Sequence, residues 1–141
     1  MTDLIRVLHV DDDPEFVEMT ATFLETEDDR LTVETAHNAC DGLERVADGE
    51  FDCIISDYEM PGQSGIEFLE AVRETHAKLP FILYTGKGSE AVASDAISAG
   101  VTDYLQKEAG TERYWLLTNR VRPAGARRRA PPVRPRYLKP L

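Results

Sequence analysis

Short apolar runs alternate with helix-length amphipathic stretches through residues 1–122. This alternation is typical of βα units around a parallel sheet, and it predicts five such units. The expected strands cover residues 5–10, 31–36, 52–56, 80–84 and 103–106. The expected helices cover residues 14–26, 39–47, 90–99 and 111–122, and the apolar positions Ile66, Phe68, Leu69 and Val72 mark one more helix.

Individual residues indicate where these elements begin and end. Pro14 suits the first turn of a helix, Asn38 is expected as an N-cap, and Gly100 is expected as a C-cap. The third strand contains the continuous apolar run Cys53-Ile54-Ile55, which is too apolar for a strand with one wet face. We therefore expect this strand near the centre of the sheet.

The composition changes abruptly at Pro123. From there to the end the chain is rich in Pro, Arg and Ala, with no helical or strand period. We expect the last helix to end near Arg122 and residues 123–141 to form a disordered, basic tail. The chain is thus interpreted as one folded domain, residues 1–122, followed by this tail.

The charges are distributed unevenly between these two parts. The chain has 26 acidic and 16 basic residues. Six of the basic residues follow Pro123, so residues 1–122 hold 10 basic and 26 acidic residues, a formal charge of −16. So acidic a domain repels nucleic acids and anionic membranes, which argues against direct contact of residues 1–122 with either. The acidic excess also supports the hypothesis of a halophilic source.

Other features of the sequence bear on the compartment. The two cysteines, Cys40 and Cys53, have neither metal-ligand spacing nor a disulfide-rich context. The N-terminus does not resemble a signal sequence, and no apolar run approaches the length of a membrane span. We expect a cytoplasmic protein with reduced thiols.

Unusual polar residues follow four of the expected strands. They are Asp11-Asp12-Asp13, Asp57, Thr85 and Lys107. In open parallel sheets the functional crevice lies beyond the carboxyl ends of the strands, so we expect these side chains to meet there. Clustered carboxylates need a cation to relieve their repulsion, and oxygen-only ligands suit Mg²⁺. A carboxylate, Mg²⁺ and a lysine around one point are what phosphoryl transfer requires.

Each of these residues also has an ordinary structural explanation when taken alone. Asp13 suits a helix N-cap ahead of Pro14, Asp57 a turn, Thr85 a strand end and Lys107 a solvated edge charge. Their common position at one end of four different strands favours a shared functional site over four separate structural roles.

Four segments carry a resemblance to a known family. They are Val10-Asp11-Asp12-Asp13-Pro14, Ile55-Ser56-Asp57-Tyr58-Glu59-Met60-Pro61-Gly62, Tyr84-Thr85-Gly86 and Asp103-Tyr104-Leu105-Gln106-Lys107. With them, residues 4–121 resemble a two-component response regulator receiver domain. The resemblance implies a doubly wound, flavodoxin-like α/β fold, (βα)5, with five parallel strands in the order 2-1-3-4-5.

The resemblance also implies a role for each site residue. Asp57 would be the phosphorylated nucleophile and a Mg²⁺ ligand, Asp12 a direct Mg²⁺ ligand and Asp11 a ligand acting through water. The backbone carbonyl of Glu59 would complete the protein ligands. Thr85 would be the switch hydroxyl, Lys107 would bond a phosphoryl oxygen, and Tyr104 would be an aromatic rotamer switch, although it equally suits a half-buried strand position.

The implied partners are those of a signalling domain rather than an enzyme. A histidine kinase or phosphotransfer protein would phosphorylate the chain. An output partner, or a second copy in a homodimer, would use the face made by the fourth helix, fifth strand and fifth helix. The sequence of residues 84–89 and 104–108 also resembles that of receiver domains at the N-terminus of haloarchaeal sensor kinases. This resemblance implies a longer native protein.

Two departures from the family pattern affect these expectations. The family usually has a cis Lys-Pro bond after the last strand, whereas Glu108 follows Lys107 here. A cis bond without proline costs about 3 to 4 kcal/mol, so we expect a trans bond and a different loop. The early end expected for the last helix at Pro123 also alters the output face.

Three alternative functions fit the sequence less well. A haloacid-dehalogenase-like phosphohydrolase would use Asp11 and Asp13, but it needs a further acidic pair after the lysine, where only Glu108 and Glu112 occur. A dinucleotide-binding fold requires glycines where the chain has Asp-Asp-Asp-Pro. A receiver fold that serves only as an interaction module would gain stability by losing some of its clustered charges.

Overall fold

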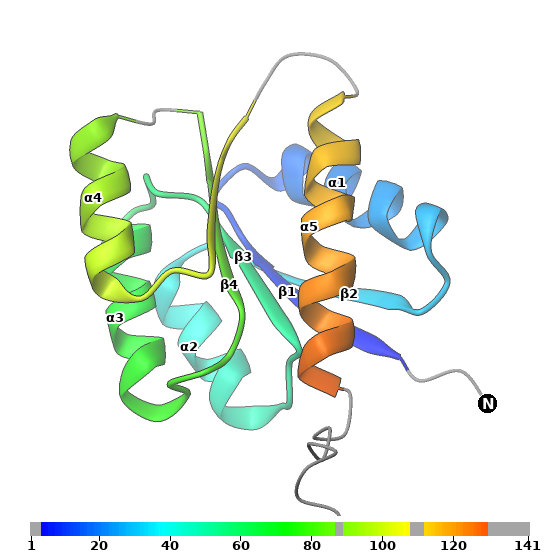
Figure 1. Ribbon diagram of the computed structural model, residues 1–141, viewed down its shortest axis with the longest axis horizontal. Helices are drawn as coiled ribbons and strands as arrows, with labels where there is room; N and C mark the ends of the chain where they lie inside the picture. The colour runs from blue at the N-terminus through cyan, green and yellow to red at the C-terminus, as the bar shows by residue number, and fades with distance from the viewer. Residues whose placement is uncertain (1–3, 87–88, 108–111, 130–141) are drawn as a thin grey trace, which may run out of the picture.

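The computed structural model describes residues 4–86, 89–107 and 112–129. Within these residues, five strands form one parallel sheet in the order β2-β1-β3-β4-β5, as the resemblance implied (Figure 1). The strands are β1 (Ile5–Val10), β2 (Leu31–Ala36), β3 (Cys53–Ser56), β4 (Phe81–Thr85) and β5 (Asp103–Gln106). The helices are α1 (Pro14–Glu27), α2 (Ala39–Asp48), α3 (Gly65–Thr75), α4 (Glu90–Ala99) and α5 (Glu112–Arg129).

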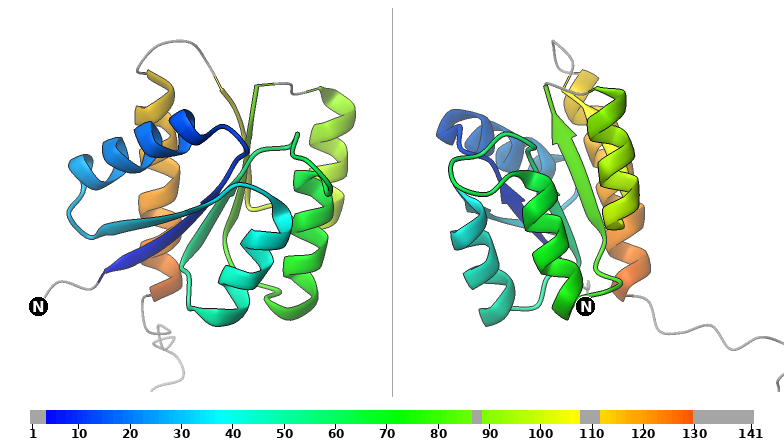
Figure 2. Two further views of the ribbon diagram at one scale, coloured as in Figure 1. Left: turned by 180° about the vertical axis from the view of Figure 1, so that it is seen from behind. Right: turned by 90° about the vertical axis from the view of Figure 1, so that its left-hand side faces the viewer.

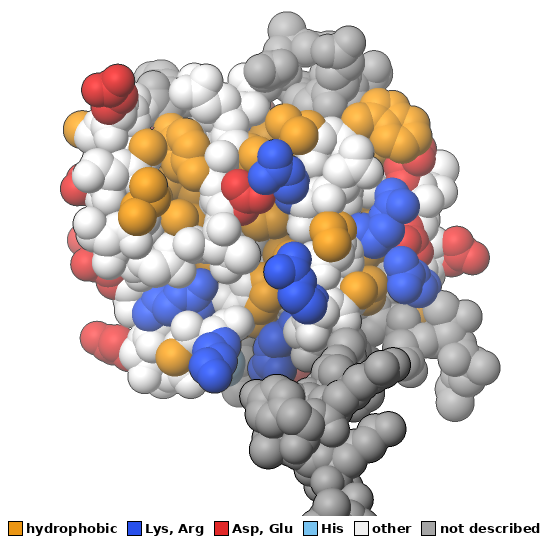
Figure 3. Space-filling view, in the orientation of Figure 1, with side chains coloured by type: hydrophobic (Ala, Val, Ile, Leu, Met, Phe, Trp, Pro, Cys, Tyr) orange, Lys and Arg blue, Asp and Glu red, His pale blue; other side chains and the backbone are white. Residues whose placement is uncertain are grey.

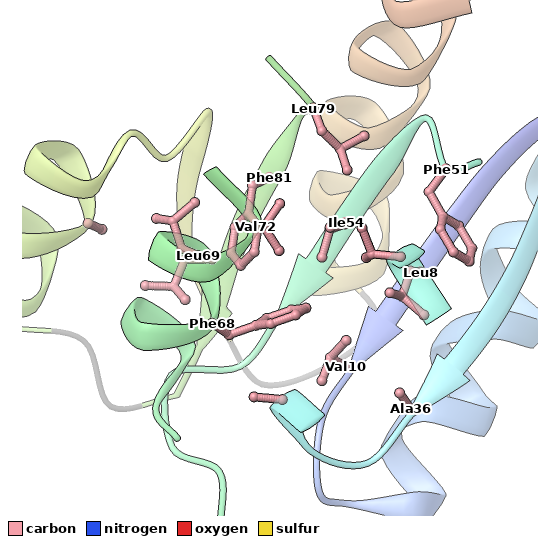
Figure 4. Close-up of a cluster of buried hydrophobic side chains, with 14 of the residues drawn as sticks. Leu8, Val10, Ala36, Phe51, Ile54, Phe68, Leu69, Val72, Leu79 and Phe81 are labelled. Carbon is pink, nitrogen blue, oxygen red and sulfur yellow. The ribbon is translucent and has the colours of Figure 1, made fainter. Parts of the chain in front are cut away.

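The helices cover the sheet on both faces. Helices α1 and α5 pack on one face, and α2, α3 and α4 pack on the other (Figures 1 and 2). Successive residues of a strand point to opposite faces, so β1 sends Val7 to the α1 and α5 side and Leu8 to the other. All four residues of β3 are buried, which agrees with its predicted central position. Figure 4 shows the larger layer, in which Phe68 and Leu69 of α3 meet Ile54 and Phe81.

Side-chain caps fix the starts of the helices. The Asp13 side chain accepts a hydrogen bond from the backbone N–H of Phe16 at the start of α1, and Asn38 accepts one from Asp41 at 2.8 Å at the start of α2. Helix α4 ends at Gly100, whose φ of 93° lies in the left-handed region that glycine tolerates best. The predicted caps at Asn38 and Gly100 are confirmed.

Helix α5 corrects one prediction, because it continues through Pro123 to Arg129 instead of ending near Arg122. A proline inside a helix costs about 3 kcal/mol, since it removes a hydrogen bond and crowds the preceding turn. Here the residues after the proline are buried: Ala124 is 6% exposed, and a Cβ added to Gly125 would lie 2.3 Å from Cγ2 of Ile5. Close packing on β1 therefore keeps the last turns helical.

Some expectations fall outside the described residues. The Lys107–Glu108 bond, expected to be trans, and residues 130–141, expected to be disordered, are among them. In the described part of the chain, no helix is long and apolar enough to span a membrane.

Candidate functional site

The backbone places three of the predicted site residues directly beyond their strands. The N–H of Asp11 donates to the carbonyl of Ala36 at 3.1 Å, and the N–H of Asp57 donates to that of Val10 at 3.0 Å. The N–H of Lys107 donates to the carbonyl of Thr85 at 2.9 Å. These bonds extend the sheet by one residue beyond β1, β3 and β5. The side chains of Asp11, Asp57 and Lys107 therefore meet at the carboxyl edge of the sheet, which is the upper edge in Figure 1.

Three carboxylates converge at this edge. One oxygen from each of Asp11, Asp12 and Asp57 lies within 4.8 Å of the others. Asp11 is fully buried, Asp57 is 9% exposed and Asp12 is exposed. Asp13 stands apart chemically, because its side chain caps α1. The structure thus separates an acidic triad from a neighbouring structural carboxylate.

Lys107 brings a positive charge into the cluster. Its ammonium donates a hydrogen bond to Oδ2 of Asp11 at 2.7 Å and lies 3.4 Å from Oδ2 of Asp57. The lysine side chain is only 18% exposed, so solvent screens these contacts weakly. One ammonium cannot balance three carboxylates, and the triad keeps a net negative charge.

Burial affects the ionisation of Asp11. It raises the pKa of this carboxyl above its ordinary value, although the hydrogen bond and the charge of Lys107 act in the opposite direction. The N–H of Asp13 also stabilises the charged form through a bond of 3.0 Å to Oδ1 of Asp11. A buried carboxylate with a raised pKa gains from a second cation. Oxygen ligands alone suit a hard ion, so these residues fit Mg²⁺.

The loop after β3 sets the orientation of Asp57. Oδ1 of Asp57 accepts a hydrogen bond of 2.8 Å from the N–H of Tyr58, and Oδ2 faces Lys107. Gly65 closes the loop, with its N–H bonded to the carbonyl of Tyr58 at 2.8 Å. A Cβ at Gly65 would lie 2.2 Å from the backbone oxygen of Asp57. Glycine is required here because helix α3 begins against the site.

The roles of three further residues, Thr85, Tyr104 and Glu59, remain predictions. Thr85 ends β4 and is 1% exposed. Tyr104 of β5 packs its ring against the core under α3 and α4, and its hydroxyl is buried. Glu59 is exposed in the loop that follows Asp57.

Sequence reasoning did not single out the aromatic residues beside Lys107. They are Phe16 of α1, Tyr84 of β4 and His9 of β1. The Phe16 ring contacts both of the other rings, and its centroid lies 4.3 Å from the ammonium of Lys107. No local signal distinguishes a ring that fills the core from a ring that faces an ammonium.

Comparison with known proteins identifies the class. The model of the response regulator receiver domain matches residues 7–118, and the chain belongs to this family. It is therefore a receiver domain of two-component phosphorelay signal transduction.

Particular relatives show the range of proteins that contain this domain. The chain is 36% identical over 123 residues to a protein-glutamate methylesterase/protein-glutamine glutaminase of a Nocardioides species, covering 85% of this chain and 33% of the relative. Other curated relatives are transcriptional regulatory proteins. The chain spans between 33% and 44% of the length of the first of these relatives.

Solved structures are similar over nearly the whole fold. A CheY-like receiver domain protein from Methanospirillum hungatei has a TM-score of 0.81 at 26% identity, covering 89% of this chain and 97% of that one. The response regulator TrrA of Thermotoga maritima, solved in complex with Mg²⁺-BeF, has a TM-score of 0.72 at 28% identity, covering 84% of this chain and 99% of that one.

Proposed function

We propose that Asp57 is the phosphoacceptor, and that a histidine kinase or phosphotransfer protein supplies its phosphoryl group in the cytoplasm. The observation that carries this proposal is the position of Lys107, whose ammonium contacts both Asp11 and Asp57 at the edge of an acidic triad. Asp11 and Asp57 each place one oxygen beside the ammonium and the other on a backbone N–H. Of these two carboxylates, Asp57 has exposed surface, 9% against 0% for Asp11, so it is the one open to an incoming phosphoryl group.

The transfer itself follows from this placement. A carboxylate oxygen of Asp57 forms a bond to phosphorus as the P–N bond of the donor phosphohistidine breaks, and the electron pair of that bond stays with the imidazole. Lys107 then donates to a phosphoryl oxygen and neutralises part of its charge. Asp11, Asp12 and the carbonyl of Glu59 would hold Mg²⁺, directly or through water, and the ion would supply further charge neutralisation.

The switch follows from the added charge. Phosphorylation adds about −2 charge at Asp57 and new acceptor oxygens, which draw the hydroxyl of Thr85 toward the site. Tyr104 lies on the neighbouring strand, and its ring would follow the space that Thr85 leaves. The outcome is a shift between two conformations of the surface, rather than a new catalytic activity.

The output surface in this proposal is made by α4, β5 and α5, the face seen in Figure 3. Apolar side chains are exposed on it, with Ile97 72% and Leu116 37% exposed. Arg120 of α5 and Asp103 of β5 form an ion pair on the same face. An output partner or a second copy would bind here, and the receiver domain extends to the end of α5 at Arg129.

The test is the intact mass of the protein after incubation with phosphoramidate and Mg²⁺ in high KCl. We expect one labile phosphoryl group on the wild type, none on Asp57→Asn, and none when EDTA removes the metal. Asp13→Asn is the matched control, because it changes a neighbouring carboxylate that only caps α1 and leaves a good N-cap.

Two outcomes would overturn the proposal. Folded wild-type protein that takes no label would indicate a module that binds partners without phosphorylation. Release of many equivalents of phosphate from a phosphomonoester would instead indicate a phosphohydrolase.

A further inference from the structure

The ammonium of Lys107 lies against an aromatic wall as well as against the acids. Its Nζ atom is 4.3 Å from the ring centroid of Phe16 and 6.0 Å from that of Tyr84. Phe16 is 8% and Tyr84 1% exposed. A cation within about 6 Å of an aromatic face is attracted by the electron density of the ring, and burial strengthens the attraction.

Neighbouring rings hold Phe16 in this position. Tyr84 packs on it with a centroid distance of 5.9 Å, and Tyr114 of α5 stacks on it at 6.3 Å. His9 meets it edge-on at 5.7 Å with an interplanar angle of 73°. The backbone N–H of Phe16 is itself fixed by the cap at Asp13. Three ring contacts and the helix cap therefore fix the position of Phe16.

His9 completes the ring packing around Phe16. The imidazole is fully buried in β1, and within the described residues neither of its nitrogens has a hydrogen-bond partner. Its edge-on contact therefore helps to fix the Phe16 ring.

We propose that Phe16 is a positioning residue for phosphoryl transfer, because its ring face holds the Lys107 ammonium between Asp11 and Asp57. A lysine side chain has a long, flexible stem, and the acidic triad alone allows its ammonium several positions. The ring adds a third contact to the two carboxylates and excludes water from the surface that it covers, so that Nζ is confined to where a phosphoryl oxygen will arrive. This inference rests on the proposed role of Lys107 at Asp57.

The experiment compares Phe16→Leu with Phe16→Tyr and with Phe23→Leu. Leucine keeps an apolar side chain without a ring face, and tyrosine restores the ring. Phe23 is the matched control, since it lies on the same helix and stacks on Tyr114 at 5.2 Å, without a cation contact to Lys107 among the described residues. Phe16→Met replaces Phe16→Leu if the leucine variant does not fold.

Two readings are taken on each folded variant. In the unmodified protein, the Cε and Hε resonances of Lys107 should carry an upfield ring-current shift that Phe16→Leu loses and Phe16→Tyr retains. With Mg²⁺ and saturating phosphoramidate, the maximum rate of labelling should fall about three- to tenfold in Phe16→Leu, from the loss of the cation–π attraction. It should recover in Phe16→Tyr and stay unchanged in Phe23→Leu.

The two readings separate the possible failures. An unchanged Lys107 resonance in Phe16→Leu overturns the inference whatever the labelling shows. A lost ring-current shift with a wild-type labelling rate also overturns it, because position would then not affect transfer. A wild type that takes no label refutes the proposed function and, with it, any positioning role in transfer, even if the resonances show that Phe16 holds the ammonium.

Discussion

Asp11 combines complete burial with a negative charge, and Lys107 compensates that charge only in part. Because folding raises the pKa of Asp11 above its ordinary 3.8, the folded protein favours the protonated form of this carboxyl more than the unfolded chain does. Its contribution to stability is therefore fully present below pH 3.8 and is lost as the pH rises through the raised value. The charged Asp11 thus destabilises the fold at neutral pH, and a bound cation would relieve this cost.

This predicts a pH-dependent stabilisation by Mg²⁺. At pH 7, Mg²⁺ at ten times its dissociation constant should add about 1.4 kcal/mol, or roughly 4 °C in Tm for a domain of this size. The gain should shrink as the pH falls through the raised pKa of Asp11, and it should be smaller in Asp11→Asn. Thermal unfolding at several pH values, with and without MgCl₂, measures it.

The control is again Asp13→Asn, which should keep the full Mg²⁺ effect because the Asp13 side chain serves as a cap. An equal gain from Mg²⁺ in wild type and Asp11→Asn would show that the ion binds elsewhere.

At the scale of residues, sequence reasoning identified the acids and the lysine but not their surroundings. Asp57, Asp11 and Lys107 could be predicted because each follows a strand, and the ends of parallel strands meet at one edge. The ring of Phe16 over the ammonium could not, because that contact joins α1 to the segment after β5 and depends on three-dimensional packing. The requirement for glycine at position 65 could not be predicted either, because it arises from the close approach of the backbone oxygen of Asp57.

Helix α5 shows how packing overrides local preference. Pro123 and the run of arginines argue for a chain that leaves the fold, yet Val121 is fully buried and Ala124 is 6% exposed. Glycine at position 125 allows α5 to lie close to Ile5 of β1. The absence of a side chain, usually unfavourable inside a helix, is the condition for this contact.

We therefore predict that Gly125→Ala destabilises the protein. On an exposed helix face the change would stabilise by about 1 kcal/mol. Here the new methyl group would lie 2.3 Å from Cγ2 of Ile5, and overpacking of this kind costs about 1 to 3 kcal/mol. Urea unfolding of the single variants and of the Ile5→Ala, Gly125→Ala double variant measures the coupling between the two sites.

The double variant should lose less stability than the sum of the two single variants, because Ile5→Ala removes the clashing group. A Gly125→Ala protein that is more stable than wild type would contradict the close approach of α5 to β1.

Most other elements followed from the sequence to within one or two residues. The bounds of β1, β2, α4 and β5 are those predicted, since each has a clear apolar period and a marked end. The end of α5 could not be placed, because the evidence for it lies in Ile5, at the other end of the chain.

For the whole molecule, charge is the dominant feature. The formal charge is −10 for the chain, and the basic residues are concentrated after Pro123. Repulsion among the acids opposes compactness, and dissolved salt screens exposed charges that are farther apart than roughly 10 Å at 0.1 M.

We accordingly expect Tm to rise between low and molar KCl. Screening of the acidic body should give the larger part of the increase at low salt, where the screening length changes most. Thermal unfolding across a KCl series measures it, with tetramethylammonium chloride as a control for ionic strength. A flat or falling Tm would refute adaptation to high salt.

The hydrogen bond between Lys107 and Asp11 joins residues 96 positions apart. The two lie beyond β5 and β1, so the site is complete only when the last strand has joined the sheet. During synthesis, a chain that contains only the first three or four βα units has the acidic residues of the site but not yet Lys107. Under the proposed function, only chains that have been synthesised and folded through Lys107 can accept the phosphoryl group, so an incomplete chain cannot carry the signal.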